Sequence, residues 1–297
     1  MAISDAHVHF FSRSFFSKLL AVKPEMTPES ACAQLGWTAP SDEPAQLAGA
    51  WVRELDRHGV ARSALIASVP GDDASVRAAT EAYPNRFFAF AMVNPKSWNP
   101  EALSGIHVAC LFPAMHCFSI QDELARSVFD WAQSNRRAVF VHCGFLSVGV
   151  RGKLGLPSPF DMRFSNPIDL HAVALRYPEV PIIVPHFGAG YFREALMLAD
   201  LCPNVYLDTS SSNRWVRYLE PHHLESRVDL RHILRQALDV VGHKRLLFGS
   251  DSSYFPRGWH HQVFEEQARA LYEIGLGEPE ARAVFAENLM RIVAGRL

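Results

Sequence analysis

Side chains of the metal-ligand type stand at four separated places in this sequence. His7 and His9 lie two residues apart near the beginning of the chain. Single polar residues end three later apolar runs: His142 in AVFVHCG, His186 in PIIVPHFG and Asp251 in RLLFGSD. Imidazole and carboxylate groups are ligands that Zn²⁺ prefers. The pattern predicts a metal site that is assembled from four segments of the chain.

The position of each residue in its predicted strand supports this interpretation. Side chains two residues apart in a strand point to the same side, so His7 and His9 project together. The other three residues each close a hydrophobic run just before a loop. A barrel of parallel strands gathers such strand ends on one face. Each residue alone also fits a structural role, but their coincidence at strand ends favours a metal site.

Short β-rich runs alternate with longer amphipathic segments along the whole chain. The runs predict strands near 3–9, 62–68, 87–93, 106–112, 138–143, 181–186, 204–208 and 245–250. Helical spacing of apolar residues predicts helices that include 45–58, 120–136 and 279–294. Eight strands that alternate with helices predict an α/β fold, a (β/α)8 TIM barrel.

The connections differ in length on the two faces of the predicted barrel. Long segments follow the strands that end near 9, 143, 208 and 250, whereas the returns from helix to strand are short. The loops after the strands build the site of such a barrel, on its C-terminal face. The sequence contains no repeat and no linker, so we expect one domain over 1–297. Residues 10–43 are the least regular part, and we expect them to form a lid or insertion over this face.

Composition places the chain among ordinary globular enzymes. Of its 297 residues 48% are hydrophobic and 20% charged, and a net charge of −2 gives no reason to expect a nucleic-acid or membrane partner. No apolar run approaches the roughly 20 residues of a membrane span. The beginning of the chain lacks the pattern of a secretory signal. Five cysteines without C-x-x-C spacing indicate reduced thiols, and we expect a cytoplasmic protein.

The chain resembles the amidohydrolase superfamily, in particular its amidohydrolase 2 branch, which includes aminocarboxymuconate-semialdehyde decarboxylase. The resemblance covers the whole predicted barrel. The matching segments are DAHVHF at 5–10, FAFAMVNP at 88–95, VFVHCG at 139–144, VPHFG at 184–188, VYLDTS at 205–210, LFGSD at 247–251 and ENLMRI at 287–292.

The resemblance implies a set of roles for these residues. It implies that one divalent metal is held by His7, His9, His142 and Asp251. The metal would be Zn²⁺, with Mn²⁺ or Fe²⁺ as alternatives. Asp251 would also take the proton of an activated water. His186 would lie beside the metal and polarise the substrate, move protons or add a further ligand. Asp5 would orient a ligand histidine.

The fourth predicted strand argues for one metal per chain. Binuclear members of the superfamily carry a bridging carboxylated lysine there, but the segment at 105–116, GIHVACLFPAMH, contains no lysine. It also departs from the Lys-x-His-Pro pattern of the decarboxylase-containing branch. Cys110 is an alternative ligand, although a buried cysteine is usually a small apolar core residue.

The resemblance implies a metal-dependent hydrolase of a small molecule, and the loops indicate an anionic one. Arg214 and Arg257 follow strand ends closely, and a guanidinium binds a carboxylate with two parallel hydrogen bonds. We expect them to bind the substrate, a lactone or amide of an organic acid. The alternative is a non-oxidative decarboxylase of an aromatic or muconate-like acid, and a metal-free lactonase is a third reading. Exposed helix faces are compatible with a homodimer.

Overall fold

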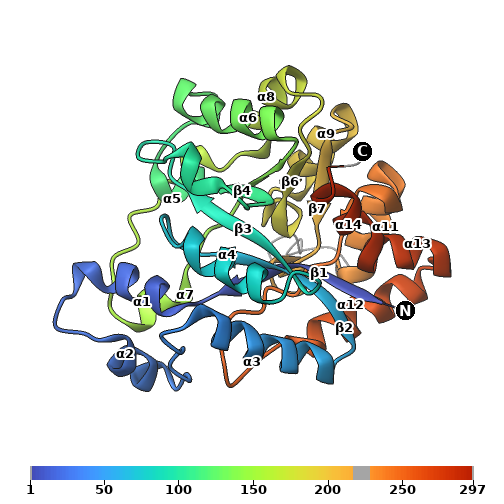
Figure 1. Cartoon of the computed structure of the whole chain (residues 1–297). Coiled ribbons are helices and arrows are strands. Elements are labelled where there is room, and N and C mark those ends of the chain that lie inside the picture. The colour runs from blue at the N-terminus through green and yellow to red at the C-terminus, as the bar shows by residue number, and fades with distance from the viewer. Residues whose placement is uncertain (1, 217–227, 296–297) are drawn as a thin grey trace.

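Eight parallel strands form one sheet in which each strand pairs with the next in chain order (Figure 1). The computed structural model describes residues 2–216 and 228–295. Residues 1, 217–227 and 296–297, which the predicted domain also includes, lie outside the described residues. The strands are β1 (Ile3–Phe10), β2 (Val60–Ala67), β3 (Phe87–Val93), β4 (Val108–Leu111), β5 (Ala138–Val141), β6 (Ile182–Val184), β7 (Val205–Asp208) and β8 (Leu246–Leu247). They confirm the predicted barrel, each within a few residues of its expected position.

Helices cover the outside of the sheet (Figure 1). Those that follow strands are α3 (Pro44–Arg57), α4 (Asp73–Ala82), α6 (Glu123–Asn135), α8 (His171–Arg176), α9 (Phe192–Leu201), α11 (Leu230–Val241), α12 (His261–Glu273), α13 (Glu278–Arg282) and α14 (Asn288–Val293). Shorter helices on the loops are α1 (Arg13–Leu19), α2 (Pro28–Leu35), α5 (Pro113–His116), α7 (Gly149–Lys153) and α10 (Ser212–Trp215). The connection between β3 and β4 has no α-helix and contains one short 3₁₀ helix, η2 (Pro100–Leu103).

The last predicted helix, 279–294, is interrupted. A π-helical segment, Ala283–Glu287, separates α13 from α14. The backbone N–H of Phe248, just after β8, donates to the carbonyl of Val284 over 3.1 Å. The interruption therefore coincides with a contact between this helix and the barrel wall, which the apolar periodicity does not indicate.

The two faces of the sheet form two layers of core. Ile66, Phe90, Cys110 and Phe140 belong to a buried cluster that fills the barrel, whereas neighbouring strand residues pack under the helices. This alternation follows from the two-residue period of a strand. The ring of Phe140 lies 5.4 Å from the ring of His7, so the apolar filling of the barrel reaches the predicted site from below.

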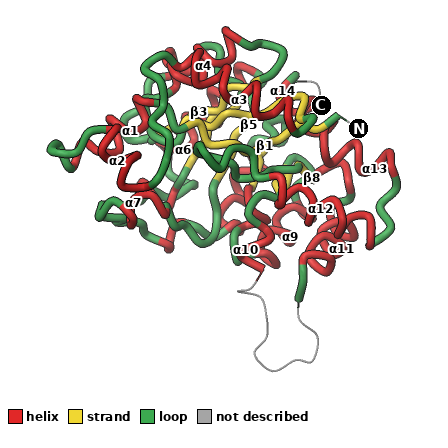
Figure 2. Tube along the Cα trace, turned by 90° about the horizontal axis from the view of Figure 1, so that it is seen from below, coloured by secondary structure: helices red, strands yellow, loops and turns green. Residues whose placement is uncertain are grey.

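The segment 11–43 packs on the loop after β5. Figures 1 and 2 both show α1 and α2 beside α7. Buried apolar residues join them: Phe15, Phe16, Leu19, Leu20, Ala31, Cys32, Val150, Leu154 and Leu156. Hydrogen bonds run from Lys23 to the carbonyl of Leu154 and from Gln34 to that of Lys153. The segment is therefore attached to a loop that follows a strand end, and the predicted role of residues 10–43 as a lid or insertion stays a prediction.

None of the described helices is both long enough and apolar enough to cross a membrane.

Asp5 joins the first and last strands. Its carboxylate is buried and accepts hydrogen bonds from the backbone of His7 (2.9 Å) and Ser250 (3.0 Å). It also accepts from the Ser250 hydroxyl (2.5 Å) and the Trp259 indole (2.7 Å). Burial raises the pKa of Asp5 to about 6, despite these four donors. Backbone bonds such as Ala6 N–H to Phe248 carbonyl (2.8 Å) complete the closure of the barrel.

Replacing Asp5 by alanine should lower the free energy of unfolding by about 2–4 kcal/mol, because several buried donors lose their acceptor. Chemical denaturation of the metal-free protein measures this without a contribution from metal binding. The control is Ser4→Ala at the adjacent buried position, which should cost less than about 1 kcal/mol. Equal losses in the two variants would contradict the closing role of Asp5.

Candidate metal centre

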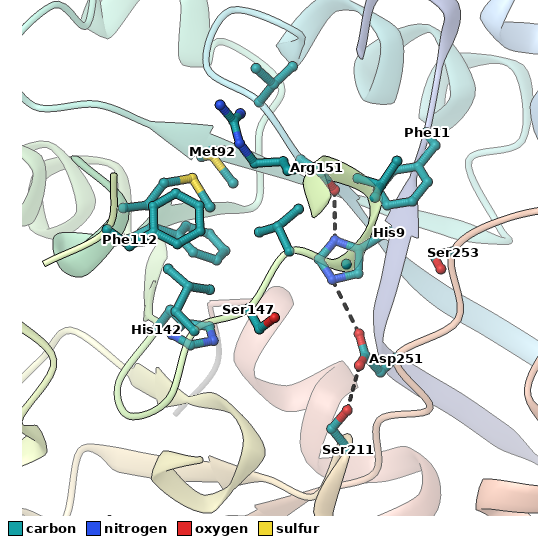
Figure 3. A pocket seen from close by; sticks show the side chains of 18 of the residues that line it. His9, Phe11, Met92, Phe112, His142, Ser147, Arg151, Ser211, Asp251 and Ser253 are labelled. Carbon is teal, nitrogen blue, oxygen red and sulfur yellow. Dashed lines mark hydrogen bonds and ion pairs between the residues drawn. The ribbon is translucent and has the colours of Figure 1, made fainter. Parts of the chain in front are cut away.

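Three potential ligand atoms, two from β1 and one from the loop after β8, converge on the face where the strands end. His7 Nε2 lies 3.4 Å from His9 Nε2 and 3.8 Å from Asp251 Oδ1. His9 Nε2 lies 3.2 Å from the same oxygen. These atoms form a group compatible with a metal ion. Figure 3 shows His9 and Asp251 facing each other, with Ser211 beyond the carboxylate.

The hydrogen bonds behind the two imidazoles fix which nitrogen faces this point. His7 Nδ1 lies 2.7 Å from Asp208 Oδ2, and a carboxylate can only accept, so Nδ1 carries the proton. His9 Nδ1 lies 2.7 Å from the hydroxyl oxygen of Ser68, whose own proton goes to the Ile66 carbonyl. Both Nε2 atoms are thus left with lone pairs.

The donor set fits a divalent cation. Two imidazole lone pairs and a carboxylate oxygen within 4 Å of one another repel unless a positive charge lies between them. Burial lowers the pKa of His9 and so favours the neutral form that a ligand needs, whereas the charge of Asp208 raises the pKa of His7 despite its burial. Burial alone would raise the pKa of Asp251, but the neighbouring histidines hold it well below its usual range. Zn²⁺ is compatible with this mixture of nitrogen and oxygen ligands.

A polar layer beneath the site holds the histidines in place. Asp208, the last residue of β7, is completely buried. Burial alone would raise its pKa, but His7 lowers it below its ordinary value, so the group is ionised. The Ser210 hydroxyl lies 3.0 Å from His7 Nδ1 and 2.8 Å from His186 Nδ1, and donates to Asp208. One buried carboxylate thereby orients His7 directly and His186 through Ser210.

His186 is presented by an unusual turn after β6. Its φ is 57°, and Phe187 and Ala189 also have positive φ, a conformation that costs about 1–3 kcal/mol for such residues. The Nδ1 of His186 donates to the Ser210 carbonyl over 3.0 Å, so Nε2 keeps a lone pair. The ring centroid lies 4.8 Å from that of His7. His186 also converges with His7 and Asp208 in a second group of ligand type.

His142 lies beside His186 rather than among the three converging atoms. The two ring centroids are 5.3 Å apart in an edge-to-face arrangement, and among the described residues neither ligand group contains His142. Its Nδ1 is buried and has no hydrogen-bond partner within the described part of the chain. Burial holds the pKa of His142 well below its usual range. It is thus a neutral imidazole with unmet bonding capacity, and its role as a metal ligand stays a prediction.

Two glycines allow the strand ends to approach this closely. A Cβ at Gly144 would lie 1.9 Å from the Gly188 carbonyl oxygen, so only glycine lets the loops after β5 and β6 touch. At Gly249 a Cβ would lie 2.9 Å from the Cβ atoms of His7 and Ser210. Asp251 itself has a φ of 58°, so the turn after β8 is also in the left-handed region.

A cavity of about 680 Å³ opens above the converging atoms. His7, His9, His142, His186 and Asp251 all line it. Among the other described lining residues are the aromatic side chains Phe11, Phe15, Trp37, Phe112, Phe145, Phe160, Trp215 and Tyr254. The site is therefore accessible to a small molecule with both apolar and polar parts.

Both predicted substrate-binding arginines reach this cavity. Arg214 stands on α10 and is exposed, whereas Arg257 follows β8 and is half-buried. Arg257 Nη2 donates to the Asp251 carbonyl (3.2 Å) and to the Ser253 hydroxyl (2.9 Å). Arg151 and Lys153 on α7 also line the cavity. Among the described lining residues Asp251 alone is acidic, so cations outnumber acids.

The structure differs from the sequence analysis in what orients the ligand ring. Asp5 was expected to do so, but its hydrogen bond with His7 is to the backbone N–H, and the imidazole is bonded to Asp208 instead. Asp208 closes the apolar run VYLD just as Asp251 closes its own, so the same signal was present. Cys110 lies within the barrel core, and burial raises the pKa of its thiol well above its usual range. It belongs to neither described ligand group.

A family model described as Amidohydrolase matches residues 4–293 of the chain. Protein fluG of Emericella nidulans is 38% identical over 92 residues, which are 31% of this chain and 10% of that protein. The matched region thus spans a small part of the length of this curated relative.

Solved structures share the fold over nearly their whole length. An amidohydrolase from Burkholderia multivorans with bound zinc has a TM-score of 0.64 at 17% identity, with 99% of each chain covered. 5-Carboxyvanillate decarboxylase from Sphingomonas paucimobilis has a TM-score of 0.62 at 13% identity, with 99% of each chain covered. A protein from Acinetobacter baumannii is described as a probable 2-pyrone-4,6-dicarboxylic acid hydrolase. Its structure has a TM-score of 0.61 at 15% identity, with 99% of this chain and 100% of that chain covered.

Replacing Asp208 by asparagine should weaken zinc affinity about 10- to 100-fold, because the His7 ring loses the charged acceptor that fixes its orientation. Competition with a fluorescent chelator measures the dissociation constant in the folded protein. Asp200→Asn, an exposed change on α9, is the matched control and should bind zinc like the unaltered chain. Zinc affinity that is the same in both variants would refute the positioning role of Asp208.

Proposed function

Because this chain belongs to the amidohydrolase family, we propose that it is a mononuclear metal-dependent hydrolase of a small, anionic organic molecule, a lactone or an amide. The observation that carries the proposal is the convergence of His7 Nε2, His9 Nε2 and Asp251 Oδ1 beneath a cavity rich in cations. We propose His142 as the further ligand.

The bound metal would supply a Lewis acid and lower the pKa of water to about 7. The residues around it would move the protons. Asp251 Oδ2 accepts a hydrogen bond from Ser211 (2.5 Å), and this carboxylate takes the proton of the attacking water. His186 offers the lone pair of Nε2 at the cavity wall, because Nδ1 donates to a carbonyl. It relays the proton that Asp251 has taken from the water to the leaving group.

Unmet donors in the cavity indicate the chemistry of the substrate. Trp215 Nε1 and Arg257 Nε are buried and have no partner among the described residues, and both side chains line the cavity. These nitrogens can only donate, and each unmet buried donor costs about 1–3 kcal/mol. A ligand rich in acceptor oxygens satisfies them. We therefore propose a carboxylate substrate that Arg214 and Arg257 hold.

Decarboxylation of an aromatic or conjugated acid is the second candidate. The aromatic wall of the cavity favours it, since flat side chains suit a flat substrate. The likeness to 5-carboxyvanillate decarboxylase supports it at the level of the fold. In both reactions Asp251 and His186 move the proton, so the residues alone do not separate them. Hydrolysis remains our first proposal because β4 lacks the Lys-x-His-Pro pattern.

The wider setting of the enzyme is also a proposal. We take Zn²⁺, one ion per chain, as the native metal, with Mn²⁺ or Fe²⁺ as alternatives. The partner is a small molecule rather than a nucleic acid or a membrane. The five cysteines are unpaired in the structure, and this supports a reducing compartment such as the cytoplasm. Homodimer formation is compatible with the outer helices.

Isotope labelling separates the two reactions. Zinc-loaded protein is incubated in H₂¹⁸O with a panel of small carboxylate lactones and amides and of aromatic acids. The proposal predicts one ¹⁸O atom in the acid product and no released CO₂. Release of CO₂, with deuterium on the product carbon when the reaction is run in D₂O, would establish the decarboxylase instead.

Arg214→Met and Arg257→Met should each raise KM for the anionic substrate about 10- to 100-fold and change kcat less, because a charged hydrogen bond is worth about 1.5–3 kcal/mol. The methyl ester of the same substrate lacks the charge, and its KM should change little. Arg193→Met on α9, outside the lining of the cavity, is the control. If the ester and the acid respond equally, the arginines do not hold a carboxylate.

A further inference from the structure

A row of stacked aromatic rings connects the segment 11–43 with the loop after β8. The ring centroids of Phe15 and Phe11 are 4.3 Å apart with 8° between the planes. Those of Phe11 and Trp37 are 5.8 Å apart at 15°, and those of Trp37 and Tyr254 are 4.0 Å apart at 10°. All four side chains line the cavity. Near-parallel rings from three separate parts of the chain thus form one wall of the site.

The row ends on the guanidinium of Arg257. Its Cζ lies 4.5 Å from the centroid of the Tyr254 ring. Trp37 already covers one face of that ring at 4.0 Å, and two groups cannot occupy one face at these distances. Tyr254 is therefore held between Trp37 and Arg257. A cation over an aromatic face is attracted by about 0.5–2 kcal/mol, and the stack fixes the plane in which the guanidinium lies.

The hydrogen bonds of Arg257 further restrict the orientation of its guanidinium group. Nη2 is engaged with the Asp251 carbonyl and the Ser253 hydroxyl. Nε is buried and has no partner in the described part of the chain. Because Nη2 and the Tyr254 ring constrain the group at different points, Nε keeps one direction. Through Nη2 the guanidinium contacts the backbone of Asp251, whose carboxylate belongs to the candidate metal centre.

We propose that Trp37 is a positioning residue: by stacking on Tyr254 it orients Arg257 so that the Nε donor of Arg257 meets a carboxylate of the substrate. This inference rests on the proposed function, in which Arg257 binds that carboxylate. It makes segment 11–43 part of substrate recognition rather than only a cover.

The backbone supports the placement of Trp37. Gly36 ends α2 in a left-handed conformation, and the Trp37 N–H donates to the Cys32 carbonyl over 2.8 Å. The next residue, Thr38, donates its N–H to the Phe255 carbonyl over 2.8 Å. The segment is therefore bonded to the β8 loop at the residue adjacent to the stacked pair.

The test compares two replacements of Trp37 in the zinc-loaded full chain, with benzoate as the probe carboxylate. Trp37→Leu removes the ring but keeps apolar volume, and it should weaken benzoate binding about fivefold by calorimetry. Trp37→Phe keeps a ring and should bind within about twofold of the unaltered chain. In an Arg257→Met background, Trp37→Leu should cause no further loss. Unchanged affinity in Trp37→Leu, or losses that multiply in the double variant, would overturn the inference.

A second readout does not depend on substrate binding. With arginines labelled at ¹⁵Nε, the Arg257 signal is identified by its loss in Arg257→Met. It should shift and broaden in Trp37→Leu and remain in place in Trp37→Phe. An Arg257 signal that is the same in Trp37→Leu as in the unaltered chain would overturn the positioning contact. If the signal responds but Arg257→Met binds benzoate normally, the contact stands and the carboxylate-binding role of Arg257 in the proposed function fails.

Discussion

The structure depends on one electrostatic constraint: two imidazole nitrogens and a carboxylate oxygen face a common point within 4 Å of one another. His7 Nε2, His9 Nε2 and Asp251 Oδ1 are held there because the far side of each group is bonded to something else. Asp208 and Ser68 accept hydrogen bonds from the Nδ1 atoms of the two histidines, and Ser211 donates to the remaining carboxylate oxygen. Such an arrangement is unfavourable by itself, and a divalent cation makes it favourable.

The rest of the fold can be understood as the means of maintaining that arrangement. His186 and Asp251 have left-handed backbone conformations, and glycines at 144 and 249 let neighbouring loops approach within contact. Residues adopt such conformations only where the surrounding structure enforces them. The apolar filling of the barrel and the carboxylate of Asp5, which ties β1 to the end of β8, supply that enforcement.

Much of this site could be predicted from local sequence, because its residues end strands. The two-residue period placed His7 and His9 on one side, and the hydrophobic runs indicated where His142, His186 and Asp251 would emerge. Polar side chains that bond behind the ligands were not predicted. Serine is common at the start of loops. Only the three-dimensional structure shows that Ser68 contacts His9 and that Ser210 contacts His7. Contacts between distant segments, such as Trp37 with Tyr254, leave no local pattern at all.

We propose that a single metal ion lies between His7, His9 and Asp251. The most direct test is an anomalous-diffraction map of crystals grown from protein that was purified without chelator or added metal, recorded above and below the zinc edge. The account predicts one peak per chain, about 2.0–2.2 Å from His7 Nε2, His9 Nε2 and an Asp251 oxygen. A metal bound instead among His7 Nδ1, His186 and Asp208, or a second ion beside the first, would contradict it.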